Sequence, residues 1–166
     1  MNDARYWIDM LDLEPHVEGG YFKETYRSVE HIDKHALPER FSGDRFFCTA
    51  IYFLLHNNDF SAFHRINQDE LWHFYIGDPL IIHIIDWREN YSQIKLGMNL
   101  DKGEVFQAMI PHGSWFGANL QSPDSFALVG CTVAPGFDFT DFEIAQRDDL
   151  VNLFPEHRQI IEQLTR

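Results

Sequence analysis

The sequence predicts an all-β domain, an antiparallel jelly roll or barrel with short helices at its two ends. From residue 19 to about residue 143, apolar residues fall in runs of strand length, and turn-forming residues separate these runs. Aromatic residues make up 15% of the chain and lie mostly in the runs, which favours a β-sandwich or barrel over a helical bundle. A length of 166 residues fits one domain, so residues 1–166 are expected to share one core.

Residues 3–13 predict a short amphipathic helix that packs on the outside of the domain. Asp3 is suited to cap its first turn, and Pro15 ends it. Its apolar residues recur at helical spacing: Tyr6, Trp7, Met10 and Leu11.

Eight apolar runs then follow one another as candidate strands. They are "YFKETY", "CTAIYFLL", "ELWHFYI", "LIIHIIDW", "SQIKLGM", "VFQAMI", "SWFGANL" and "FALVGCTVA". Turn-forming stretches such as "HNND", "GDP", "DKGE", "PHG" and "QSPD" separate them. Eight or nine short strands without helical periods between them are typical of an antiparallel jelly roll. The polar segment 28–45 is predicted to be a surface loop, and a loop folded over the mouth of a pocket is the alternative.

After "APGFDFTDFE" the pattern becomes helical again. Asp148 and Asp149 are suited to cap one turn, and Pro155 fits the first position of a last helix over residues 155–165. The apolar face of that helix consists of Ile160, Ile161 and Leu164.

The charge balance argues against two classes of partner. The chain has 13 Lys plus Arg against 26 Asp plus Glu, which gives a formal net charge of −13. This charge repels the phosphate backbone of nucleic acids and the surface of anionic bilayers, so neither is expected as a partner. An anionic small molecule would need locally concentrated positive charge, for which the candidates are Lys23, Arg27, Arg45 and Arg65.

The sequence also predicts a cytoplasmic protein. Its two cysteines, Cys48 and Cys131, lie in apolar surroundings, and the N-terminal residues lack the basic region and apolar core of a signal peptide. No apolar run approaches the ~20 residues that a membrane span needs.

Two stretches have the spacing of a known pair of motifs. His64, Glu70 and Gly77 match the first cupin motif, G(x)5HxH(x)3-4E(x)6G, except that Ile66 occupies the place of its second histidine. The stretch "GEVFQAMIPHGSWFGANL" matches the second motif, with Phe116 in the place of its histidine. The sequence thus resembles a cupin, a resemblance that implies a double-stranded β-helix.

Only two of the four usual cupin metal ligands are present. His64 and Glu70 alone do not make a metal site, which needs three or more ligands in fixed geometry, so no metal or other cofactor is predicted. His73 would be the third ligand in the alternative, a metal-dependent cupin with a reduced ligand set. Strand alternation argues against that alternative, because Trp72 and Phe74 point inward with Glu70 whereas His73 points away.

Longer phrases resemble one cupin family more closely. The blocks "PHVEGGYFKETYRS", "HRINQDELWHFYIGDPL" and "ALVGCTVAPGFDFTDFE" look like those of the cupin family long catalogued as a domain of unknown function. This resemblance implies a homodimer and a proposed sugar-epimerase activity. "GGYFKE" is also similar to a phrase of the metal-free dTDP-sugar 3,5-epimerases, and His64 falls where they carry their catalytic base. Phe116 departs from them, because they have a histidine there.

An epimerase needs a base, an acid on the opposite side and donors for the enolate oxygen. His64 with Glu70 is the candidate base, because a neighbouring carboxylate orients an imidazole and raises its basicity. Candidates for the acid are Tyr21 and Tyr52, and candidates for the donors are Lys23 and Arg65.

Two alternatives to an enzyme remain open. The first is a small-ligand-binding module without catalysis, whose pocket is lined by Trp72, Phe74, Phe116 and Trp115. The second is a purely structural pair, in which His64 and Glu70 satisfy each other inside an aromatic core.

Overall fold

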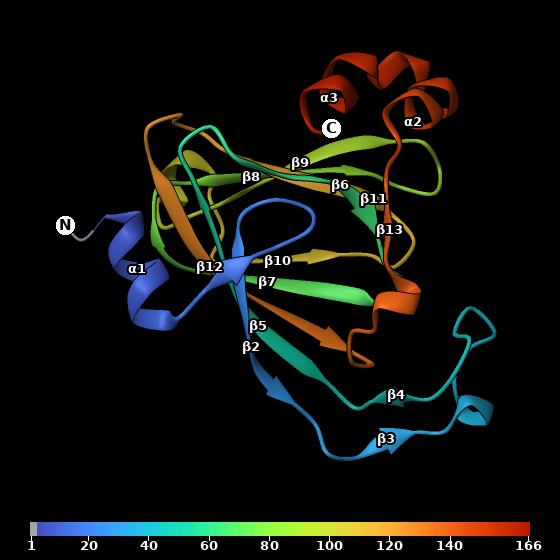
Figure 1. The fold of residues 1–166 in the computed structure, drawn as a ribbon. Helices are drawn as coiled ribbons and strands as arrows, with labels where there is room; N and C mark the ends of the chain where they lie inside the picture. Colours follow the sequence, from blue (N-terminus) through green and yellow to red (C-terminus); the bar gives the residue numbers. More distant parts are fainter. Residues whose placement is uncertain (1–2) are drawn as a thin grey trace.

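The computed structural model describes residues 3–166, and two antiparallel β-sheets that face each other make up most of it (Figure 1). The first sheet has the order β1 (Glu14–Pro15), β2 (Tyr21–Arg27), β5 (Thr49–His56), β12 (Phe126–Ala134), β7 (Asp69–Gly77) and β10 (Gln107–Ile110). The second has the order β13 (Glu143–Ile144), β6 (Phe60–Arg65), β11 (Trp115–Leu120), β8 (Leu80–Ile85) and β9 (Tyr91–Leu96). The predicted all-β jelly roll is confirmed.

Short helices lie outside the sheets at both ends of the chain, as predicted. The N-terminal helix α1 (Ala4–Leu11) begins where the Asp3 carboxylate accepts a hydrogen bond from the Tyr6 backbone N–H, at 2.9 Å. Its one buried residue, Ile8, packs with Leu54 and Leu128 against the first sheet.

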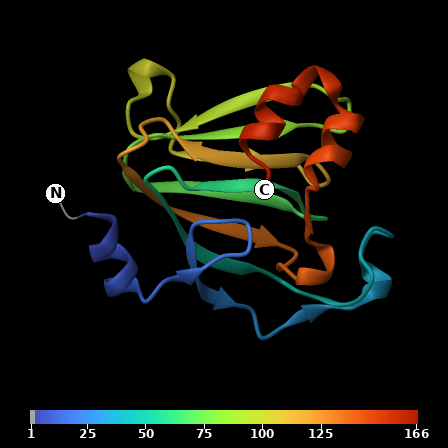
Figure 2. The same ribbon diagram turned by 45° about the horizontal axis from the view of Figure 1, so that its top comes forward.

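The C-terminal helices cover the outer face of the second sheet (Figure 2). They are α2 (Arg147–Leu153), a 3₁₀ turn (Pro155–His157) and α3 (Arg158–Gln163). Asp148 and Asp149 lie within the first turn of α2 rather than at its cap, where their charges favour the helix N-terminus. Within residues 3–166, no helix has both the length and the apolar character needed to cross a membrane.

The segment 28–45 is a surface loop with little regular structure. It contains the two-residue strand β3 (His31–Ile32) and a 3₁₀ turn (Lys34–Ala36), and β3 pairs with β4 (Arg45–Phe46). This small ribbon projects away from the two sheets (Figure 1).

A buried ion pair ties this projection to the other end of the chain. The Arg45 guanidinium donates to both carboxylate oxygens of Asp141, each at 2.6 Å, and both residues are buried. Asp141 also accepts hydrogen bonds from the side-chain amides of Gln68, at 2.7 Å, and Asn67, at 3.0 Å. Arg45 is therefore a structural residue and cannot offer its charge to a ligand.

Strand β6 is the longest strand that the sequence pattern did not predict. Residues 61–64 are all buried, so the strand shows no alternation of apolar and polar residues. Phe63 packs under the C-terminal helices, and the next residue, His64, faces the space between the sheets. The strand's sequence "FSAFHR" has polar residues at three of six positions, so it forms no apolar run of the kind that marks the other buried strands.

Candidate functional site

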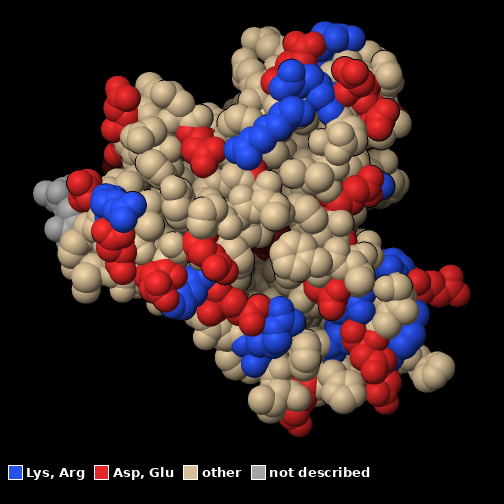
Figure 3. Space-filling view, viewed as in Figure 1, with Lys and Arg blue, Asp and Glu red and all other residues tan. Residues whose placement is uncertain are grey.

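A cavity of about 90 Å³ opens between the two sheets. Its buried polar lining consists of Thr49 and four titratable residues, His16, Glu18, His64 and Glu70. Its aromatic lining consists of Phe22, Phe53, Trp72, Phe137, Phe139 and Phe142. Glu24 and Arg27 lie at its more exposed edge. Figure 3 shows a hollow near the centre of this face, with acidic side chains gathered below it.

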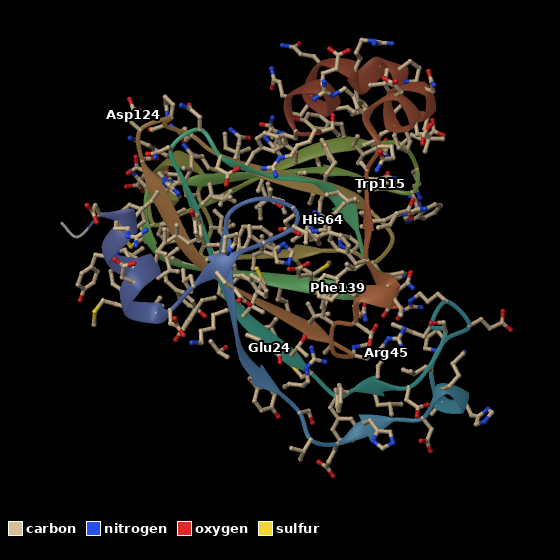
Figure 4. The ribbon with its side chains drawn as sticks, viewed as in Figure 1. Glu24, Arg45, His64, Trp115, Asp124 and Phe139 are labelled. Carbon is tan, nitrogen blue, oxygen red and sulfur yellow. The ribbon has the colours of Figure 1, made fainter. Side chains whose placement is uncertain are left out.

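His64 and Glu70 reach the cavity from opposite sheets. His64 lies on β6 of the second sheet and Glu70 on β7 of the first, although only five residues separate them in sequence. Alternation along β7 turns Glu70 and Trp72 inward, whereas Leu71 and Tyr75 are exposed. The turn between the two strands therefore places two residues of one motif across the cavity from each other. Figure 4 shows His64 between the two sheets.

The segment between β1 and β2 brings His16 and Glu18 to the same cavity. The backbone N–H of Ala62 on β6 donates to the Glu18 carbonyl, at 2.8 Å, and the N–H of Gly20 donates to the Asp59 carboxylate, at 2.7 Å. These bonds hold the segment against β6 (Figure 1).

Gly20 has to be glycine for this segment to close. Its φ is +72°, and an added Cβ would lie 2.7 Å from the Leu54 carbonyl oxygen. Gly103 has almost the same φ, +74°, with no atom within 4 Å of such a Cβ. We expect Gly20→Ala to lower the free energy of unfolding by about 1–3 kcal/mol more than Gly103→Ala, measured by urea denaturation. Equal losses in the two variants would show that the contact with Leu54 is unimportant.

The Glu18 carboxyl is the centre of the polar group. The Ser61 hydroxyl donates to its Oε1 at 2.8 Å, and its Oε2 lies 3.2 Å from His64 Nε2 and 3.4 Å from His16 Nδ1. Glu18 and His64 are 6% and 3% exposed, so solvent does not screen these contacts.

The His64 ring has both nitrogens engaged. Its Nδ1–H donates to the Ala62 carbonyl at 2.7 Å, because a carbonyl can only accept, and its Nε2 faces Glu18. Burial lowers the pKa of His64 and raises the pKa of Glu18, and both shifts favour uncharged groups. One proton lies between Glu18 Oε2 and His64 Nε2, and both shifts favour its place on the carboxyl. His64 lines the cavity with its Nε2 against Glu18, and its role as the base stays a prediction.

Glu70 is the carboxyl group left free to meet a ligand. Its side chain lines the cavity and is only 8% exposed. Burial raises its pKa to about 7, a rise that the nearby His64 reduces and Glu18 increases. The Cys131 thiol and the Trp72 indole N–H lie close enough to lower this pKa, and Trp72 Nε1 has no hydrogen-bond partner within residues 3–166. The cavity thus contains one carboxyl poised near neutral pH and one unused donor beside it.

The raised pKa of Glu70 predicts a pH dependence of stability. The folded protein holds the Glu70 proton up to about pH 7, whereas the unfolded chain releases it near the ordinary value of 4.5. This stabilisation, on the order of 3 kcal/mol, is fully present below pH 4.5 and is lost as pH rises to 7. We expect the stability difference between wild type and Glu70→Gln to fall over this range in urea denaturation. A difference that is flat with pH would contradict the assignment.

Five of the other sequence-predicted pocket residues do not line the cavity. Lys23 pairs with Asp12 at 2.7 Å, and Arg65 pairs with Glu143 at 2.7 Å, both on the surface. The Arg65 guanidinium also lies 4.6 Å over the Trp115 ring, which packs toward the C-terminal helices. The remaining two belong to the core between the sheets, namely Phe74 and Phe116. Trp72 is the one member of the predicted pocket set that lines the cavity.

The tyrosines considered as acids also lie elsewhere. Tyr21 packs in the cluster beneath α1, with its ring 5.6 Å from His56. Tyr52 packs in the same cluster, with its ring 5.9 Å from Tyr75. Neither tyrosine lines the cavity.

Comparison with models of known protein families shows which family the chain belongs to. A model of the family described as "Cupin superfamily (DUF985)", Cupin_5, matches residues 5–145. The chain belongs to this cupin family. Its relatives include the uncharacterised protein YML079W of Saccharomyces cerevisiae, with 31% identity covering 86% of this chain and 75% of the yeast protein.

Solved structures agree with the cupin assignment. Protein SO0799 from Shewanella oneidensis has a TM-score of 0.91 and 37% identity, covering 100% of this chain and 99% of that one. A hypothetical protein from Leishmania major has a TM-score of 0.88 and 35% identity, covering 99% of each chain. Oxalate decarboxylase from Bacillus subtilis has a TM-score of 0.56 and 13% identity, covering 93% of this cupin and 37% of that chain, which shows the shared fold alone.

The donor set of this cupin does not fit a metal in the cavity. Ile66 and Phe116, which occupy the two ligand positions, are buried carbon side chains, and the Phe116 ring centre lies 4.1 Å from that of His64. His73 lies outside the cavity lining, where its Nε2 is 3.1 Å from the Thr132 hydroxyl. In the described part of the chain, the only cluster with metal-ligand spacing is the exposed set His31, Asp33 and Asp44.

His16 and Glu18 are the functional residues that sequence reasoning missed. They lie in "PHVEGGYF", a stretch that the sequence marks only by family resemblance. Two titratable residues beside a pair of glycines were the available signal, because glycines permit close backbone approach. Their contact with His64 spans more than forty residues, so no local pattern contains it.

Proposed function

We propose that this cupin is a metal-independent enzyme of isomerase or epimerase type, which moves a proton on a small carbonyl compound in its cavity. The proposal rests on the position and the raised pKa of Glu70. Its carboxyl is buried, faces the cavity and has a pKa of about 7. Such a group can accept and release a proton at neutral pH, as a general base and acid must.

In the proposed reaction, ionised Glu70 takes the proton from the carbon next to the carbonyl. The electron pair of that C–H bond forms the enolate. The enolate oxygen is suited to accept a hydrogen bond from the Trp72 indole N–H, which has no partner within the described residues. Glu18, held by Ser61, breaks its hydrogen bond to His64 Nε2 and donates that proton to carbon. Solvent then takes the Glu70 proton and reprotonates Glu18. His64 is a positioning residue in this scheme, because it touches Glu18 and not the substrate.

Hydrogen–deuterium exchange at carbon tests the proposal without knowledge of the natural substrate. The protein would be incubated in D₂O with uncharged hydroxyketones and hydroxyaldehydes of three to six carbons, and loss of the α-proton signal followed by NMR. We expect exchange above the rate in buffer for at least one compound. Exchange no faster than in buffer throughout the series would refute the proposed activity.

A non-catalytic binding module is the second candidate, favoured by the six aromatic side chains that line the cavity. Phe139 is suited to test it, because the side chain lines the cavity yet is 59% exposed, so its removal does not threaten folding. A binder without catalysis would lose affinity in Phe139→Ala and would exchange no α-proton.

Metal content separates this cupin from a metal-dependent one. Because Ile66 and Phe116 replace two ligands, we expect elemental analysis of protein expressed in metal-supplemented medium to find well below one metal per chain. One tightly held metal per chain, lost in Glu70→Gln, would overturn the metal-independent mechanism.

We also propose a cytoplasmic homodimer, on the strength of the family resemblance. Supporting residues lie on the outer face of the first sheet, where exposed Leu71 on β7 pairs in register with exposed Met109 on β10, and Tyr75 is also exposed. Sedimentation that found only the monomer would contradict this. The expected lack of nucleic-acid and membrane partners stays a prediction.

A further inference from the structure

We infer that the cavity takes an uncharged, hydroxyl-bearing carbonyl compound and discriminates against phosphorylated, nucleotide-linked and carboxylate ligands. The inference rests on the proposed function and names the substrate class for the same site. It follows from which charged groups around the cavity are already paired with another group of the protein.

The one cationic side chain in the described cavity lining is already neutralised. Arg27 donates from Nε to one carboxylate oxygen of Glu24, at 3.0 Å, and from Nη2 to the other, at 2.7 Å. Its Nη1 donates to the Phe137 carbonyl at 3.2 Å, and the guanidinium lies 5.1 Å over the Phe46 ring. A bidentate ion pair with these extra contacts leaves little positive charge for a ligand.

The other groups of the cavity add no positive charge. Burial lowers the pKa of both His16 and His64, so the imidazoles are neutral near pH 7. Three carboxyl groups line the space, namely those of Glu18, Glu24 and Glu70. A phosphate or carboxylate that entered would lose its water and meet acidic groups in return, which is unfavourable in a poorly hydrated space.

Two polar groups of the lining match an uncharged ligand instead. The Trp72 Nε1–H has no hydrogen-bond partner within the described residues, and the Glu70 carboxyl, whose near neighbours are the Cys131 thiol and this indole, forms no ion pair there. The two residues stand two positions apart on the same face of β7. A hydroxyl can donate to Glu70, and a carbonyl oxygen can accept from Trp72. The aromatic walls formed by Phe22, Phe53 and Phe142 suit the C–H surface of such a molecule.

A positively charged ligand fits the same carboxyl less well. Glu70 must gain and lose a proton in the proposed reaction, whereas an ammonium group beside it would lock it in the ionised form. An uncharged ligand leaves the titration of Glu70 intact.

Three probes built on one six-membered ring test the inference. They are 2-hydroxycyclohexanone, cyclohexanecarboxylate and cyclohexylammonium, each titrated into ¹⁵N-labelled protein at pH 7. The readout is the NMR signal of the Trp72 indole N–H, identified by its loss in Trp72→Phe. We expect the hydroxyketone to shift this signal and to bind at least tenfold more tightly than either charged probe. Glu70→Gln should weaken its binding several-fold, and Glu104→Gln, a change at a buried glutamate outside the lining, should not.

Each other result overturns the inference. The carboxylate binding as tightly as the hydroxyketone would show an anion site, and the ammonium binding more tightly would show a cation site. No shift with any probe would show that the space between Glu70 and Trp72 does not take such ligands. Binding is measured without turnover, so a hydroxyketone that binds but exchanges no α-proton would leave the ligand class intact and refute the proposed catalysis.

Discussion

Glu70→Gln is expected to reduce α-proton exchange by about 10²–10⁴-fold, the usual contribution of a general base. Glutamine keeps the size of the side chain and its place on β7, but its amide does not titrate near neutral pH. The reduction should appear in the rate constant of exchange more than in probe affinity, because the proton is transferred only in the reaction step.

Glu104→Gln is the matched control for this loss. Glu104 is also a buried glutamate, 5% exposed, but its carboxylate accepts from the Asn99 backbone N–H, at 2.7 Å, and lies 3.4 Å from Lys95 Nζ. We expect its substitution to lower stability and to leave exchange unchanged. Full exchange in Glu70→Gln would remove Glu70 from the mechanism.

Arg45→Ala is expected to be among the most destabilising single changes in the chain. It leaves the Asp141 carboxylate buried without its charge partner, at a cost of about 3–5 kcal/mol. For a domain of this size, such a loss lowers Tm by about 6–20 °C in differential scanning calorimetry.

Arg158→Ala provides the comparison at the surface. Arg158 pairs with Glu162 at 3.0 Å one helical turn away, and both side chains are about half exposed. Its loss should cost about 0.3–0.5 kcal/mol. If the two arginine variants melted within about 2 °C of each other, the buried pair would contribute no more than the exposed one.

Most of the fold could be predicted from the sequence because most of its longer strands are apolar runs bounded by turn-forming residues. In the run "ELWHFYI" alternation strengthens the signal, since Trp72 and Phe74 are buried and Leu71 and Tyr75 exposed. Strand β6 could not be predicted, because "FSAFHR" mixes apolar with polar residues although residues 61–64 are all buried.

The candidate site could be predicted only in part. The motif identified His64 and Glu70, whose roles depend on contacts that it does not contain. Lys23 and Arg65 are candidates because of their charge. Each follows a residue that lines the cavity, Phe22 and His64 respectively, so the alternation of side chains along a strand turns both to the opposite face. The partner of His64 is Glu18, which comes from a segment far away in the chain.

Glu18 and Glu70 reach the cavity from elements that differ in how firmly they are held. Glu70 and Trp72 belong to β7, which pairs with β12 on one side and β10 on the other, whereas Glu18 sits on a short connection near the N-terminus. That connection is held to β6 by few backbone bonds, including Ala62 N–H to the Glu18 carbonyl. If this connection alone detached from β6, Glu18 would leave His64 Nε2, while both sheets stayed folded. In the proposed mechanism, such a local opening would remove the second acid and leave Glu70 and Trp72 in place on β7.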